Sequence, residues 1–496
     1  MSPDTIISNP LGWGQMKLLG GWKRILLICA IYAGALLLFN ILIYRSIPER
    51  IALSTFANGS LIVTVFTEVC LLLLVGVIAI RKSVQRDFTS EMITSHRTTA
   101  MTGHTAVFGY LTGATLTVLC LTAINWIACT VLARLAGDPI AAASIIFVIL
   151  GCLAVLVWTF TLLVALSTSG KTSIGGWIIT GAIVLGQIPT TAYLMHPGLS
   201  LILGLTTVTN LSTAATTGTV DKSIFATMFA QLLLAAIFYL ASARKFQRDD
   251  VPAFNPPLAY TLLAICVLTS AAALRFWSSA NASPFGLPIL TGPSSGMLPQ
   301  QGVVTLVGLA LVAMLPIANA ARNSAVWCKR KAKDPDFTGN KPRPFIEAPI
   351  IATLIVFVIL VLIVGTKAKQ IPALNSEHPR DILKTVGYVI LAFLLTSFAF
   401  AGFLRFSLGT SSTRAIWILF VFVVFVWAMP PLIDTALSML YERGGDDPVS
   451  WLFGCSPIST WVLLLVGRPE GPVIPGLLAQ AGLAAGALLL ARKAKY

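Results

Sequence analysis

The chain has 496 residues, of which 56% are hydrophobic and 11% are charged, and its formal net charge is +15. Soluble domains carry roughly a quarter charged residues, so this chain has too few charges to coat the two or three soluble domains that its length would make. Its basic residues lie in short clusters between apolar runs. That pattern favours a lipid bilayer with anionic head groups over nucleic acid as the partner.

The apolar runs predict an all-α polytopic membrane protein with about twelve transmembrane helices, since a hydrocarbon core about 30 Å thick needs roughly 20 apolar residues per helix. The first six spans are expected near residues 25–44, 61–80, 105–133, 140–168, 174–194 and 223–243. The second six are expected near residues 258–277, 302–321, 348–366, 385–406, 415–437 and 474–491.

Two shorter apolar segments, 196–212 and 451–466, contain or follow a proline. They are expected to form short re-entrant helices on the outer side, after the fifth and eleventh spans. The first apolar run follows Lys23 and Arg24 and has no clear small-residue cleavage site, so it is interpreted as a retained span rather than a signal peptide. Most of the 34 Lys and Arg residues would lie inside if both termini were cytoplasmic. The predicted location is the cytoplasmic (plasma) membrane.

The two series of spans resemble a duplication. Ala230-Gln231 in the sixth span recurs as Ala479-Gln480 in the last, and Asp87-Phe88-Thr89 after the second span recurs as Asp336-Phe337-Thr338 after the eighth. Both units would start and end inside, so the sequence predicts two parallel six-helix repeats, residues 1–250 and 251–496.

The second span holds the most unusual residue for membrane depth, Glu68. Placing a carboxylate there costs at least ~2.5 kcal/mol, and such residues usually face an interior cavity. Glu68 either contacts a substrate or proton in a transport pathway or is a hydrogen-bonded structural carboxyl group at a helix interface. Asn125 in the third span is the second candidate for the substrate pathway, although buried amides more often join helices.

No sequence pattern for an enzyme is present. The four histidines show no metal-ligand spacing, and the eight cysteines form no C-x-x-C pair that would indicate zinc or a disulfide framework. Gly170-Lys171-Thr172 lacks the first glycine of a phosphate-binding loop, because that position is Ala165. We therefore expect no enzymatic activity and no cofactor in this chain.

The polar run from Arg86 to Gly103 predicts a cytoplasmic helix near residues 88–103, capped by Ser90 and ended by Gly103. Such a helix is either a docking element for a soluble partner or an ordinary connector. Its expected faces comprise Met92, His96 and Thr99, with Glu91, Ser95 and Thr98 beside them.

The segment also resembles a known family. Glu91-Met92-Ile93, Arg97 and Met101-Thr102-Gly103, followed by Val107-Phe108-Gly109-Tyr110-Leu111, are similar to the coupling helix and third span of the permease subunit of type-2 ABC exporters. The resemblance implies two fused permease domains with short re-entrant outer helices. It also implies that ATP is bound by separate cytoplasmic nucleotide-binding ATPase subunits, since this chain has no Walker motif. The docking residues it implies are Glu91, Met92, Ser95, His96, Arg97 and Thr98.

The second unit departs from this pattern, because residues 334–347 are short and proline-rich. We expect an asymmetric exporter with one strong and one weak docking contact. Two alternatives stay open. A proton- or ion-coupled secondary transporter also has a 6+6 repeat, although its long loop usually joins the halves, where Arg244–Pro257 is short here. A non-transporting membrane scaffold is the other.

Overall fold

The computed structural model describes residues 9–46, 53–98, 101–137, 140–167, 222–248, 253–277, 297–334, 344–367, 379–408 and 473–493, with residues 426, 455–457, 460, 461 and 464. Within them the chain is helical and contains no strand, which confirms the all-α class. The chain forms two compact units that divide between Ala253 and Phe254, in the connection where the predicted boundary also lies.

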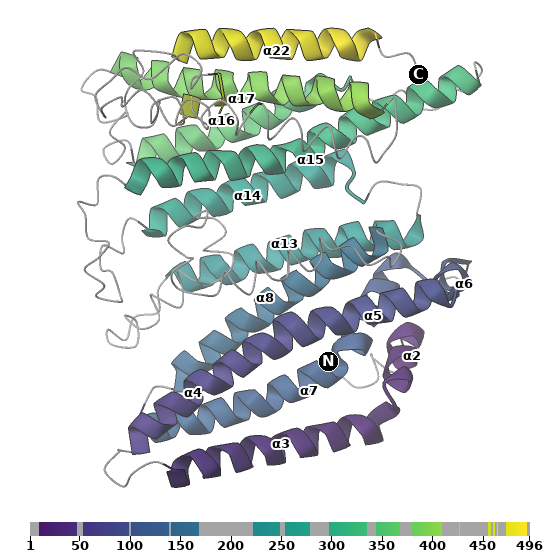
Figure 1. Ribbon diagram of the computed structural model, residues 1–496, viewed down its shortest axis with the longest axis vertical. Helices are drawn as coiled ribbons and strands as arrows, with labels where there is room; N and C mark the ends of the chain where they lie inside the picture. The colour runs from purple at the N-terminus through teal and green to yellow at the C-terminus, as the bar shows by residue number, and fades with distance from the viewer. Residues whose placement is uncertain are drawn as a thin grey trace, which may run out of the picture. The chain divides into compact units, whose positions relative to one another are not determined.

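The helices of the first unit are α2 (Pro10–Leu18), α3 (Gly21–Ser46), α4 (Leu53–Cys70), the π-helical turn η1 (Leu71–Val75), α5 (Gly76–Thr89), α6 (Met92–Thr98), α7 (Gly103–Ala136), α8 (Ile140–Ser167) and α13 (Lys222–Gln247). Those of the second unit are α14 (Pro256–Trp277), α15 (Met297–Lys333), α16 (Glu347–Lys367), α17 (Pro379–Leu408) and α22 (Val473–Lys493) (Figure 1).

Seven of the described helical stretches are long and apolar enough to cross a membrane, which is consistent with a multi-pass membrane protein. They are Gly21–Leu42, Phe56–Thr89, Gly103–Ala136, Ser144–Ser167, Ile224–Gln247, Lys384–Phe406 and Val473–Arg492. Each overlaps a predicted span.

The other five predicted spans do not coincide with any of these seven stretches. α14 and α16 carry shorter apolar stretches where spans were expected, and α15 covers residues 302–321 as one helix with Pro316 inside it. The predicted spans 174–194 and 415–437 lie outside the described residues apart from residue 426, as does the re-entrant segment 196–212.

α7 is the centre of the first unit and packs against α2, α3, α4, α5, α8 and α13. Glycine allows the closest of these approaches, as is common between membrane helices. A methyl group on Gly113 would lie 2.9 Å from Cβ of Gln15 in α2, and one on Gly103 would collide with the backbone of Ala243 in α13. These two positions therefore require glycine.

The directions of the helices in the first unit follow from residue pairs. Tyr32 of α3 contacts Asn125 of α7 while Ile25 packs near Leu116, so α3 and α7 are parallel. α4 and α5 run opposite to α7, because Glu68 pairs with Asn125 and Asp87 pairs with Tyr110.

α8 and α13 run in the same direction. Ile149 clusters with Ile224 near the start of both helices. Phe160 packs on Phe238 further along, with ring centroids 5.1 Å apart. The end of α13 lies beside α6, where Arg97 donates to the carbonyl oxygen of Phe246.

α2 is a short helix that runs across the direction of α3 and α7 (Figure 1). Asn9 caps it, since its Oδ1 accepts from the backbone N–H groups of Leu11 and Gly12, both at 3.1 Å. Gly20 and Gly21 follow with φ of 94° and 70°. Residues that carry a side chain rarely adopt these φ values, so the two glycines permit the turn from α2 into α3.

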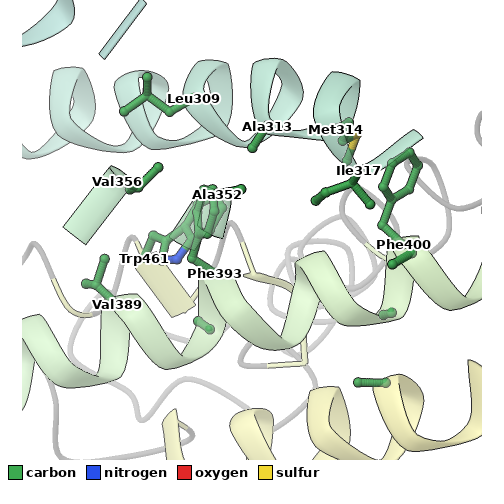
Figure 2. Packing of buried hydrophobic residues seen from close by; sticks show 14 of the residues in the cluster. Leu309, Ala313, Met314, Ile317, Ala352, Val356, Val389, Phe393, Phe400 and Trp461 are labelled. Atoms are coloured by element: carbon green, nitrogen blue, oxygen red, sulfur yellow. The ribbon is translucent and has the colours of Figure 1, made fainter. Parts of the chain in front are cut away.

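α17 packs against α15, α16 and α22 in the second unit. Figure 2 shows this core, with Ala352 of α16 beside Phe393 of α17 and Ile317 of α15 nearer to Phe400. The ring of Trp461, fully buried, lies 6.2 Å from that of Phe393 at an interplanar angle of 29°.

Trp461 belongs to the predicted re-entrant segment 451–466. The described part of this segment contains a helical turn, because the N–H of Thr460 donates to the carbonyl oxygen of Ser456 at 3.0 Å. Gln480 of α22 donates through Nε2 to Oγ1 of Thr460, also at 3.0 Å. Since Ser456, Thr460 and Trp461 are all 0% exposed, this turn is part of the core of the second unit.

Candidate functional site

Glu68 and Asn125, both predicted for the substrate pathway, are in direct contact. Nδ2 of Asn125 donates to Oε2 of Glu68 at 2.9 Å, and the hydroxyl of Tyr32 donates to Oδ1 of Asn125 at 2.7 Å. Glu68 and Asn125 are 0% exposed. The network thus joins α3, α4 and α7 in the interior of the first unit.

Two further side chains lie near the Glu68 carboxyl group. Thr122 also interacts with the carboxyl group, and Cys129 lies near it. Oε1 of Glu68 and Oγ1 of Thr122 are both buried without a partner of good hydrogen-bond geometry in the described part of the chain. Ser60 and Thr64 precede Glu68 at four-residue steps and are buried on the same face of α4. This stripe could hydrogen-bond a polar group or take up a proton.

The π-helical turn η1 begins three residues after Glu68. Such turns are rare in proteins, and those that occur often lie at functional sites. Nε1 of Trp158 in α8 donates to the carbonyl oxygen of Leu72 at 2.8 Å, so the indole satisfies a backbone group in the turn. The Trp158 ring lies directly against Gly76, which leaves no room for a side chain there.

The predicted cytoplasmic helix near 88–103 is present in a shorter form. α5 continues to Thr89, and Ser90 ends α5 rather than capping the next helix, since its hydroxyl donates to the carbonyl oxygen of Arg86. Glu91 then adopts φ of 56°, a left-handed backbone conformation that is unusual for a residue other than glycine. Gly103 starts α7 behind the capping residue Thr102 instead of ending α6. Local capping of α5 and α7 therefore confines α6 to seven residues.

The predicted docking residues divide into two groups on α6. Glu91, Met92, Ser95 and Thr98 are exposed. His96 and Arg97 are half-buried, and Nε of Arg97 donates to the carbonyl oxygen of Phe246 at 2.8 Å. Ile93, 3% exposed, fastens the other side of the helix. α6 thus presents a small exposed face while Arg97 and Ile93 hold it against the unit.

Sequence reasoning missed a second buried acid, Asp87, at the α6 end of the unit. Its Oδ2 accepts from the Tyr110 hydroxyl at 2.6 Å and from Nε2 of Gln15 at 3.2 Å. Asp87 is 3% exposed, and it joins α2, α5 and α7. One signal was available: an acid in the last turn of a helix opposes the helix dipole and therefore needs another partner.

The second unit has a different arrangement at the corresponding place. α15 extends to Lys333 and α16 starts at Glu347, while residues 335–343 of the predicted shortened segment lie outside the described residues. At its end, the ring of Phe345 lies under the guanidinium of Arg405 in α17, 4.7 Å from its Cζ. Arg405 also donates to Ser324 of α15. In the second unit Arg405 of the long helix α17 contacts the connecting segment at Phe345. In the first unit the arginine, Arg97, belongs to the connecting helix α6 itself and contacts Phe246 of α13.

No protein-family model, curated protein or solved structure matches this chain. Among the described residues, no group of three or more His, Cys, Asp or Glu side chains could hold a metal ion.

Proposed function

We propose that this protein is the membrane-spanning permease of an ABC exporter, built from two six-span units and driven by separate ATPase subunits. The exposed face of α6 carries the proposal. A short, firmly held helix between two membrane helices, with Met92, Ser95 and Thr98 exposed, offers a rigid contact for a soluble motor.

The packing of the two units supports a repeat. In the first unit the second span (α4 and α5) packs on α7 and α8, α7 packs on α8 and on α3, and α8 packs on α13. In the second unit α15 packs on α16 and α17, α16 packs on α17 and on α14, and α17 packs on α22. Numbered by predicted span, these five pairs are the same in both units, while α7–α13 in the first unit and α14–α15 in the second have no comparable counterpart among the described helices. A duplicated six-helix fold accounts for that agreement.

The parallel course of α8 and α13 supports the even span count. If both helices cross the bilayer in the same direction, the chain between them has to cross once more, as the predicted span 174–194 would. The end of the unit formed by α2, α6 and the last turn of α13 also carries Lys17, Arg97 and Lys245. A basic end of this kind is expected on the cytoplasmic side.

The test is association with an ATPase encoded by a neighbouring reading frame. Met92→Glu and Ser95→Glu together should abolish co-purification and the stimulation of ATP hydrolysis on co-reconstitution, because they place charge on the exposed face of α6. Deleting residues 90–103 would be less informative, because Thr102 caps α7 and Gly103 is its first residue. Arg248→Glu, an exposed charge change at the same end, is the control. Undiminished association of the double variant would contradict the proposal.

The buried Glu68 network favours one second candidate, a proton-coupled secondary transporter. In that case a pH gradient alone would drive transport, and Glu68→Gln would abolish it without any ATPase present. Under the proposed function, Glu68→Gln leaves ATPase association intact, because Glu68 lies roughly 30 Å from Asp87 along the same helix.

A further inference from the structure

The outer face of α2 and the first turn of α3 form one surface of aromatic and basic side chains. Trp13 and Trp22 are 45% and 43% exposed, and Lys17, Lys23 and Arg24 are exposed beside them. Nζ of Lys17 lies 5.1 Å from the ring centroid of Trp13. No acidic residue occurs between Asn9 and Arg24, so the charge of this α2–α3 surface is entirely positive.

The opposite face of α2 fixes the position of this surface. Leu11, Gly12, Gln15 and Met16 are buried, and Gly12 lies against Gly109 and Gly113 of α7. α2 runs across the direction of α3 and α7 (Figure 1). If α3 and α7 cross the bilayer, α2 therefore lies along its surface with Trp13 and Lys17 turned away from the unit.

The positions of Lys23 and Arg24 are electrostatically unfavourable within the protein. The first turn of a helix carries partial positive charge from its unpaired N–H groups, so basic residues there oppose the dipole. The first turn of α3 contains no acid to compensate. An external anion would compensate for both the dipole and the side chains.

We propose that the α2–α3 surface binds the phosphate groups of anionic phospholipids. Exposed tryptophans next to basic residues match the two levels of a bilayer interface, where indole rings lie below the charged head groups. Gln15 joins the same helix to Asp87 at the end of α5. Lipid bound here would thus hold α2 at the end of the unit that carries α6. The proposal does not depend on transport.

Fluorescence quenching in vesicles tests it directly. The full-length protein is reconstituted in phosphatidylcholine vesicles that contain equal small fractions of either dibrominated phosphatidylglycerol or dibrominated phosphatidylcholine. Tryptophan quenching should be stronger with the brominated phosphatidylglycerol, because each basic residue near a surface enriches anionic lipid on the order of fivefold. Trp13→Phe with Trp22→Phe should remove that excess.

A matched pair of variants separates this site from general attraction. Lys23→Gln with Arg24→Gln should reduce the excess quenching several-fold. Arg248→Gln with Arg330→Gln removes two exposed positive charges outside the predicted spans and should leave it unchanged. Equal quenching by the two lipids in the parent protein would overturn the proposal. So would an equal loss in both double variants, or an excess that survives Lys23→Gln with Arg24→Gln.

Discussion

The contact between Gly76 and Trp158 shows how one residue sets a local structure within the membrane. A methyl group on Gly76 would lie 2.7 Å from Cε2 and 2.9 Å from Cζ2 of the indole ring, well inside van der Waals contact. Gly76→Ala should therefore push Trp158 away from the carbonyl oxygen of Leu72 and destabilise the protein by about 1–3 kcal/mol. A lower apparent melting temperature of the detergent-solubilised protein would measure this.

Gly59→Ala is the matched control for that substitution. Gly59 lies in α4, and nothing is within 4 Å of the position its side chain would take. Because alanine favours a helix over glycine, this variant should be neutral or slightly stabilising. The effect of Gly76→Ala should also shrink in a Trp158→Phe background, since the two residues are coupled. An unchanged melting temperature for Gly76→Ala would rule out the close packing.

Only part of this residue-level structure could be predicted from the sequence. The burial of Glu68 could, because an acid within an apolar run has few other places to lie. The burial of Asp87 was missed, because its partners Gln15 and Tyr110 lie on other helices and single-residue patterns do not reveal them. Arg97 was placed among the docking residues by the family resemblance, and the bond from its Nε to the carbonyl oxygen of Phe246, far along the chain, could not be read from the sequence.

α3 is the least enclosed of the candidate spans, with 6% of its apolar window buried, so its register against α7 depends on few contacts. Cys29 and Cys120 are both free and form one of these contacts. Mild oxidation should therefore join them in a disulfide bond. After cleavage at a protease site inserted between α6 and α7, the fragments should stay joined on a non-reducing gel.

Cys29→Ser, or reduction before electrophoresis, should release the fragments. If the fragments of the oxidised parent protein separate on the non-reducing gel just as those of the untreated protein do, α3 has another register against α7. The pair is a sensitive probe because α3 and α7 are parallel, so a shift of one turn moves the two sulfurs apart by about 5.4 Å.

Sequence patterns located the long helices better than their ends. Apolar length alone placed α7, since only a helix satisfies the backbone of so many apolar residues in a bilayer. The ends of α6 depend instead on capping: Glu91 in the left-handed conformation ends α5, and Thr102 starts α7. Ser90 and Gly103 were plausible caps of α6 by residue type. In the structure Ser90 is instead the C-cap of α5, and Gly103 is the first residue of α7.

The two units differ in chemistry where their packing agrees. In the register given by Asp87 and Asp336, the position of Glu68 is occupied by Ile317, which is buried in an apolar core. α15 continues through this position as one helix with Pro316 inside it, whereas the second span of the first unit contains the π turn η1. A buried acid in one unit and an apolar residue at the matching position of the other suit two domains with unequal roles, as the proposed asymmetric exporter requires.

The side of the membrane reached by α13 decides the span count for the first unit. α7 and α8 are antiparallel neighbours in sequence, while α8 and α13 run in the same direction. The predicted fifth span, residues 174–194, would place the ends of α8 and α13 on the same side. Reporter fusions after Ser167 and after Arg248 should therefore both fluoresce as cytoplasmic proteins, whereas a fusion after Gly137 should be active only as an external phosphatase. Opposite results for Ser167 and Arg248 would remove the fifth span and, with it, the six-span unit.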